Sequence, residues 1–159
     1  MEDRYKNLPL RNGVGIALLN KSNKIFVARR IDNPKNYWQM PQGGVDKNEN
    51  FYDAAIRELE EETSIKSVSL IKEIDGFTSY NLPANLLGII WKGKFKGQKQ
   101  KWYIFRFNGK DNEINLKTKK PEFLEWKWIN IDEITDLVVN FKHEVYLKVK
   151  KELKNLIAK

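Results

Sequence analysis

The sequence predicts a single α/β domain (α+β in the arrangement of its elements), in which a mixed sheet lies between helices. Short segments rich in β-branched and aromatic residues recur along the chain, and two longer segments have helical periodicity. The chain has 159 residues, of which 41% are hydrophobic and 12% aromatic, so it can bury one core. The simplest packing of such elements places helices on the faces of a sheet.

The first elements are predicted strands. Residues 14–19 and 24–28 flank a turn of sequence Asn-Lys-Ser-Asn at 20–23, and residues 37–40 form a short strand before Pro41. Four further strands follow, and we expect the second and third of them to pair. They are residues 68–74, 86–91, 101–107 and 124–129.

Two segments are predicted helices. In residues 51–63, Tyr52, Ala55, Ile56 and Leu59 share one face, which indicates a core-facing stripe. Residues 141–157 carry apolar side chains three or four positions apart, which is typical of an amphipathic C-terminal helix.

Composition narrows the classes of partner. Cysteine is absent, which excludes a disulfide partner, a cysteine zinc site and thiol catalysis. A formal net charge of +8 favours polyanionic partners, although a lysine-rich composition also arises from a base-biased genome. The chain has no secretory signal and no apolar run near 20 residues, so we expect no membrane association and a cytoplasmic location.

Three glutamates indicate a metal site. At about 100° per residue, a helix places Glu58, Glu61 and Glu62 on one arc. Like charges this close repel, so such a cluster needs a counter-charge. Mg²⁺ takes oxygen ligands and is commonly held by a few carboxylates together with substrate phosphates. The segment therefore predicts a metal site for phosphate chemistry.

The surrounding residues resemble the Nudix hydrolase signature G-x5-E-x7-R-E-U-x-E-E-x-G-U, in which U is aliphatic. The matching positions are Gly43, Glu49, Arg57, Glu58, Leu59, Glu61, Glu62, Ser64 and Ile65. Only Ser64 departs from the pattern, where the family has glycine. A left-handed serine there would cost about 1–2 kcal/mol and affect the helix end, not the chemistry. The resemblance implies an α/β/α sandwich with a central mixed sheet, formed by residues 1–159 as one domain.

A narrower resemblance covers most of the chain. Residues 38–44, WQMPQGG, are similar to the Nudix branch of RNA pyrophosphohydrolases and asymmetric dinucleoside polyphosphate hydrolases. So are residues 11–16, 97–102, 120–123 and 141–142. The resemblance implies Mg²⁺ or Mn²⁺ as cofactor, with two or more ions per site. The implied ligands are Glu58, Glu61, Glu62, Glu122 and Gly43, and the implied supporting catalytic pair is Glu49 with Arg57.

The branch also suggests substrate contacts. The candidates are Arg11, Arg29, Gln42, Tyr80, Gln100, Phe141 and Lys142. Tyr80 and Phe141 are candidate nucleobase stackers, although Tyr80 is equally well interpreted as a core aromatic. The basic run at 94–101, KFKGQKQK, fits either a polyanion contact or an exposed turn.

These residues predict a metal-dependent pyrophosphohydrolase. The first expectation is that it converts 5′-triphosphorylated RNA into 5′-monophosphate RNA and releases pyrophosphate. The alternative substrate is a dinucleoside polyphosphate such as diadenosine tetra- or pentaphosphate. A third hypothesis, a domain that binds RNA or nucleotide without cleaving it, would be marked by lost metal carboxylates, and here all are present.

Overall fold

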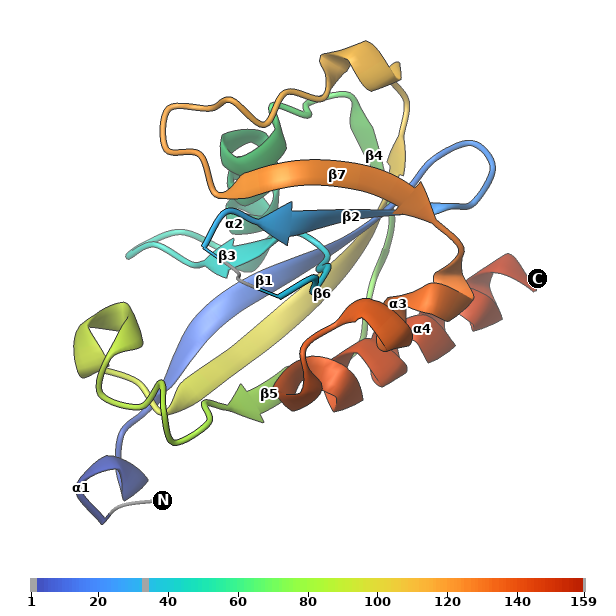
Figure 1. Cartoon of the computed structure of the whole chain (residues 1–159). Helices are drawn as coiled ribbons and strands as arrows, with labels where there is room; N and C mark the ends of the chain where they lie inside the picture. Colours follow the sequence, from blue (N-terminus) through green and yellow to red (C-terminus); the bar gives the residue numbers. More distant parts are fainter. Residues whose placement is uncertain (1–2, 33–34, 159) are drawn as a thin grey trace.

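The fold is an α/β/α sandwich around a mixed sheet, as the sequence predicts (Figure 1). The structure is a computed structural model that describes residues 3–32 and 35–158. Its strands are β1 (Leu10–Leu19), β2 (Ile25–Arg30), β3 (Gln42–Gly44), β4 (Val68–Glu73), β5 (Thr78–Asn81), β6 (Gly97–Phe107) and β7 (Phe123–Ile129). Its α-helices are α1 (Asp3–Lys6), α2 (Phe51–Thr63), α3 (Ile134–Leu137) and α4 (His143–Ile157). Short 3₁₀ turns are η1 (Ile90–Gly93), η2 (Asp111–Glu113), η3 (Ile131–Glu133) and η4 (Asn140–Lys142).

Two long central strands carry the sheet. β1 and β6 pair in parallel over ten residues, and the strand order is β4-β6-β1-β2-β7. β3 pairs with β1 and β5 pairs with β6, both antiparallel. Because neighbouring side chains in a strand point to opposite faces, β1 serves two cores. Val14 and Ile16 contact the core under α2, whereas Ala17 and Leu19 contact the core under α4.

Helix α2 has a defined signal at each end. The Asn50 side chain accepts a hydrogen bond from the Asp53 backbone N–H at 2.8 Å, which is the usual N-cap. At the other end Ser64 is left-handed with φ of 68°, and its backbone N–H donates to the Glu60 carbonyl. Ser64 therefore adopts the left-handed conformation that is expected for the family's glycine at this position. Its hydroxyl donates to the Asn115 carbonyl at 2.8 Å.

Helix α4 closes the opposite face of the sheet. Its buried residues Val145, Tyr146, Val149 and Leu153 follow the predicted helical spacing. The Tyr146 hydroxyl accepts a hydrogen bond from the Met40 backbone N–H at 2.8 Å, which ties the helix to the segment before β3. The predicted start at 141 is close, since the η4 turn leads directly into α4.

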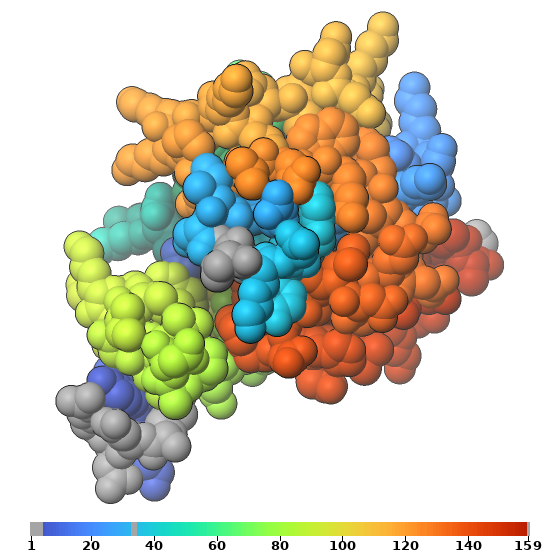
Figure 2. Space-filling model, viewed as in Figure 1, coloured from blue at the N-terminus to red at the C-terminus, as the bar shows by residue number. Residues whose placement is uncertain are grey.

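Two strand predictions are wrong. Residues 86–91 are not a strand and do not pair with β6; they form turns and lead into η1. Gly88, Trp91 and Lys92 all have positive φ, which a strand does not allow. The apolar side chains of residues 86, 87, 90 and 91 instead pack against the core under α4. Figure 2 shows this region, around residues 84–95, standing out from the body of the molecule (lime green).

Residues 37–40 also fail as a continuous strand. Only Gln39 pairs, through two backbone hydrogen bonds with Ala28 at 2.8 and 2.9 Å. The extended segment at this place is β3, which begins after Pro41. The short strand β5 was not predicted, and β1 and β6 begin four residues earlier than expected. Within the described part of the chain, no helix has the length and apolar character needed to span a membrane.

Candidate active site

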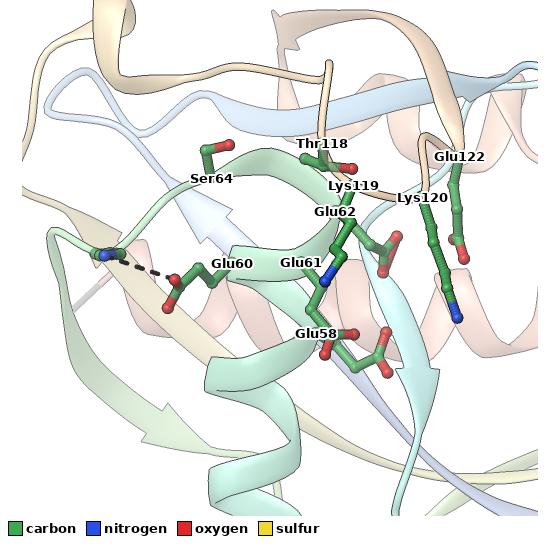
Figure 3. Close-up of a pocket in the computed structure, with 10 residues that line it drawn as sticks. Glu58, Glu60, Glu61, Glu62, Ser64, Thr118, Lys119, Lys120 and Glu122 are labelled. Carbon is green, nitrogen blue, oxygen red and sulfur yellow. Dashed lines mark ion pairs between the residues drawn. The ribbon is translucent and has the colours of Figure 1, made fainter.

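The acidic half of α2 opens onto a pocket of about 810 Å³ (Figure 3). The segment before β7 forms the facing wall. The lining residues are Glu58, Glu60, Glu61, Glu62, Ser64, Lys66, Thr118, Lys119, Lys120 and Glu122. Figure 3 shows Glu62 and Glu122 facing one another across this space. Two segments far apart in sequence therefore contribute carboxylates to one pocket.

Arg57 is the organising side chain of the site. Its guanidinium makes a two-pronged contact with Glu49, at 2.8 and 3.0 Å, and donates to the Gly44 carbonyl at 2.8 Å. It also donates to Glu58 at 2.7 Å and to Glu61 at 3.1 Å. The hydrogen bonds from Arg57 lower the pKa of Glu49. One planar group thus fixes the loop after β3 relative to two predicted ligands on α2.

The Glu58 carboxyl group occupies the space that a side chain at Gly43 would need. A Cβ built on Gly43 would lie 2.0 Å from the Glu58 carboxyl group. Burial raises the pKa of Glu58, and the neighbouring Arg57 opposes that rise. The Gly43 carbonyl accepts a long hydrogen bond, 3.4 Å, from Gln98 Nε2. The double glycine therefore lets the strand backbone approach the carboxylate closely.

Glu62 is the most unusual residue of the site. It is 3% exposed, and neither carboxylate oxygen has a hydrogen-bond partner in the described structure. Burial, and then the charges of Glu122 and Glu58, raise its pKa well above the ordinary value. The backbone N–H of Gln42 offsets part of this without completing a hydrogen bond. A buried carboxylate without donors is costly unless a cation or ligand compensates it.

The carboxylates fit a hard divalent cation in chemistry. All candidate donors are oxygens, and the two oxygens of Glu62 have no other partner. Within the described residues, no three acidic or histidine side chains are already grouped closely enough to hold one ion. The reason is visible in the contacts, because Arg57 holds Glu58 and Glu61. Arg30 lies 3.9 Å from Glu122.

Arg30 is a site residue that the sequence interpretation missed. It binds Asp32 through two hydrogen bonds, at 2.9 and 3.2 Å, and its charge acts on Glu62 and Glu122. The predicted contact Arg29 is its strand neighbour and is ion-paired with Glu125 at 2.6 Å. Adjacent residues of a strand point to opposite faces, so only one of the two faces the carboxylates. The available signal was the alternation along β2.

The predicted glutamine and tyrosine contacts lie together on the α4 side of the sheet. Gln100 donates to the Gln42 side chain at 3.0 Å, and Tyr80 donates to Gln98 at 2.8 Å. Tyr80 is only 7% exposed, which places it in the core. Arg11 lies over the ring of Trp91 at 5.0 Å.

Phe141 and Lys142 also pack against Tyr80. The ring centroids of Phe141 and Tyr80 are 5.6 Å apart, and Lys142 Nζ lies 5.5 Å from the Tyr80 centroid. Lys142 is buried, with 8% exposure. Burial, together with the charge of Arg30, lowers its pKa to about 8, while Glu62 opposes the shift. Tyr80 and Phe141 therefore contact one another, and the lysine is not a solvated surface cation.

Comparisons with known proteins show which proteins this chain resembles. The family model described as NUDIX domain matches residues 9–149. A Pelagibacter ubique protein named RNA pyrophosphohydrolase is 68% identical over 157 residues, covering 99% of both chains. A Rhodospirillum rubrum protein of the same name is 49% identical over 146 residues, covering 92% of this chain and 88% of that protein.

Solved structures support the fold. The C. elegans Ap4A hydrolase binary complex aligns with a TM-score of 0.63 and 19% identity, covering 90% of this chain and 98% of that one. The E. coli dihydroneopterin triphosphate pyrophosphohydrolase aligns with a TM-score of 0.68 and 16% identity, covering 91% and 99%. The matched domain and the two sequence relatives establish that the chain belongs to the Nudix hydrolase family.

Proposed function

We propose that this protein is an RNA pyrophosphohydrolase that converts 5′-triphosphorylated RNA into 5′-monophosphate RNA and pyrophosphate. One observation carries the choice of substrate, namely the name of the relative that is 68% identical across 99% of both chains. The pocket supports the reaction class, because it gathers five glutamates beside three lysines. A polyphosphate chain needs both cationic contacts and carboxylate-held metal ions.

The proposed metal ligands are Glu58, Glu61, Glu62, Glu122 and the carbonyl of Gly43. Bound Mg²⁺ or Mn²⁺, in two or more sites, would polarise phosphate oxygens and lower the pKa of water. The proposed role of Arg57 is positional, since its contacts with Glu49, Glu58 and Gly44 fix the ligands against the backbone. Buried Glu62 supplies a carboxylate that no protein donor competes for.

Cationic side chains in and near the pocket are the proposed phosphate contacts. Arg30 acts electrostatically on Glu62 and Glu122, and Lys120 lines the same pocket. The Lys142 ammonium group lies over the rings of Tyr80 and Phe141. Because its pKa is about 8, it is mostly protonated at neutral pH. In this proposal Arg11 and Gln42 contact the substrate from the β1–β3 side.

A dinucleoside polyphosphate is the second candidate substrate, favoured by the WQMPQGG sequence at 38–44. The two substrates differ in how many phosphates lie beyond the cleaved chain. RNA contacts that neutralise phosphates release counterions, so log K falls by about 0.7 per contact for a single strand as log salt rises. A dinucleoside polyphosphate presents only its bridging chain.

The test is a comparison of kcat/KM for triphosphorylated RNA and diadenosine tetraphosphate over a range of salt concentrations. We expect RNA to be preferred and its KM to rise more steeply with salt. Equal salt slopes with a preference for the dinucleotide would make the dinucleoside polyphosphate the working substrate. Absence of metal-dependent turnover on both would overturn the reaction class.

A further inference from the structure

Two lysines lie over an exposed aromatic ring on the side of β6 that faces away from the glutamine contacts. Phe77 is 44% exposed, and Lys99 Nζ lies 4.4 Å and Lys101 Nζ 5.2 Å from its ring centroid. Lys148 of α4 lies next to the residue before Phe77, since its Nζ lies 3.8 Å from a Cβ built on Gly76. We call Phe77, Lys99, Lys101 and Lys148 the Phe77–lysine surface.

The strand register creates this surface. β5 and β6 are antiparallel and Thr78 pairs with Gln100, so the register places Phe77 beside Lys101. Along β6, Gln98 and Gln100 are buried on the face that carries the predicted substrate contacts. Lys99 and Lys101 alternate with them and therefore point to the other face. Figure 1 shows β5 beside the beginning of α4, which explains how Lys148 joins the group.

The lysines of this surface are not neutralised by the protein. No ion pair between described residues involves Lys99, Lys101 or Lys148. The only hydrogen bond from them within the described contacts is Lys101 to the Gly76 carbonyl at 3.1 Å. Stable folding does not require two such cations over a half-exposed ring and a third beside the neighbouring Gly76. Cations beside an aromatic face are the combination that binds single-stranded nucleic acid without regard to sequence.

The surface lies within reach of the active site. The rings of Phe77 and Phe51 meet edge to face with centroids 5.5 Å apart, and Phe51 is the first residue of α2. Glu58 follows seven residues later, which is about 10 Å along the helix at 1.5 Å per residue. A single-stranded RNA whose 5′ end occupies the pocket can therefore extend along α2 to Phe77.

We propose that the Phe77–lysine surface binds the single-stranded RNA that follows the triphosphate end. A base stacks on Phe77, and Lys99, Lys101 and Lys148 contact the flanking phosphates. The statement that the bound RNA is part of the substrate rests on the proposed function. The binding itself does not, because the surface lies outside the carboxylate pocket and needs no 5′ phosphate.

Binding is tested with a decaribonucleotide carrying a 5′-hydroxyl, in EDTA, by fluorescence anisotropy. Lys99→Glu and Phe77→Ala are each expected to weaken binding at least fivefold, since base–aromatic stacking alone is worth about 1–3 kcal/mol. Lys99→Glu should also reduce the salt slope by about 0.7. Lys110→Glu is the charge-matched control and should leave affinity unchanged. Its position beyond the end of β6 is about 20 Å or more from Lys101 at 3.3 Å per residue.

Kinetics separate the surface from the active site. On a triphosphorylated dinucleotide Phe77→Ala should keep wild-type kcat/KM, whereas on a triphosphorylated decanucleotide it should lose at least fivefold. If Lys99→Glu fails to fold, as judged by circular dichroism, Lys148→Glu on the exposed side of α4 replaces it. Equal binding by wild type, Phe77→Ala and the lysine variant would overturn this inference. Surface-dependent binding without hydrolysis of triphosphorylated RNA would overturn the proposed function instead.

Discussion

At the scale of single residues, the site contains two buried side chains whose charged forms are unfavourable. Glu62 is a buried carboxylate with no donor, and Lys142 is a buried lysine with no carboxylate partner among the described ion pairs. Each would be replaced by an apolar side chain if stability alone decided. Their pKa values move in opposite directions for one reason, which is that burial disfavours the charged form. Both are expected to gain a compensating charge only when substrate and metal bind.

Lys142→Met should stabilise the metal-free protein in a pH-dependent way. The folded pKa is about 8 against an ordinary value of 10.5, so below pH 8 both states are protonated and the full burial cost is present. That cost is on the order of 3 kcal/mol. Between pH 8 and 10.5 the folded lysine is neutral while the unfolded one stays charged, so the cost disappears as pH rises.

Urea denaturation in EDTA measures this effect. The stability gain of Lys142→Met over wild type should be greatest at pH 7 and should approach zero near pH 10.5. A gain of the same size at both pH values would mean that packing, and not charge, distinguishes the two side chains. The variant should also raise the KM for triphosphorylated RNA if Lys142 contacts phosphate.

Ser64 offers a test of the helix end. Ser64→Gly relieves a left-handed cost of about 1–2 kcal/mol, but loses the hydrogen bond to Asn115 and adds unfolded-state entropy. These terms nearly cancel, so its free energy of unfolding should match wild type. Ser64→Ala keeps the left-handed backbone and loses the hydrogen bond, so it should be about 0.5–1.5 kcal/mol less stable. An alanine variant as stable as the glycine variant would show that the backbone strain is no larger than the entropy cost of glycine.

At the scale of elements, one strand can serve two partners. In β6 the buried Gln98 and Gln100 face the predicted substrate contacts, while Lys99 and Lys101 face Phe77. The basic run at 94–101 is therefore not an exposed turn over its second half, because residues from Gly97 onward belong to the strand. The period of two in a strand converts a single polar run into two different surfaces.

The element that fixes the site is the loop between β3 and α2, held by Arg57. Arg57→Lys loses the two-pronged contact with Glu49 and the reach to Gly44, since an ammonium cannot reproduce the fork. We expect kcat to fall at least tenfold, or about 1.4 kcal/mol. Mg²⁺ activation curves should shift to higher concentration.

Arg106→Lys is the matched control for that variant. Arg106 holds the β1–β2 turn through Asn20 and Asn23, on the far end of β1 from Gly43. It should lose stability with little change in kcat. If Arg57→Lys and Arg106→Lys reduce kcat equally, the loss reflects stability and Arg57 has no positioning role.

At the scale of the whole molecule, the pocket is assembled from distant segments. Glu58 and Glu62 come from α2 and Glu122 from the segment before β7. Arg30, at the end of β2, lies 3.9 Å from Glu122. The Ile31 backbone N–H donates to the Glu122 carbonyl at 2.9 Å, so the last two segments are joined directly. The antiparallel pairing of β2 with β7 brings these charges together.

Metal binding should therefore stabilise the whole fold. A ligand at 100 times its Kd adds about 2.7 kcal/mol, which for a chain of this size is a Tm rise of roughly 5–10 °C. We expect Mn²⁺ or Mg²⁺ to produce such a rise in differential scanning calorimetry, and EDTA to reverse it. Glu62→Gln should raise the metal-free Tm, because it removes a buried charge, and should lose most of the metal-dependent rise and of kcat. An undiminished metal-dependent rise in Glu62→Gln would exclude Glu62 as a ligand.

The fold class, both long helices and the acidic segment of α2 can be predicted from the sequence, because these depend on local periodicity and spacing. Helical geometry fixes the common arc of Glu58, Glu61 and Glu62 regardless of what surrounds it. The family resemblance extended this to Glu49 and Arg57, whose contact the structure contains.

The neighbours of those residues, in contrast, follow from the packing of the whole chain. Residues 86–91 have a strand-like composition, but their predicted partner β6 has no free edge, since β1 pairs with one side of it and β4 and β5 pair with the other. Whether Arg29 or Arg30 faces the carboxylates depends on how β2 is paired with β7. The burial of Glu62, Tyr80 and Lys142 depends on what packs over them. Composition and spacing encode none of this, because burial and pKa are properties of contacts between residues far apart in the chain.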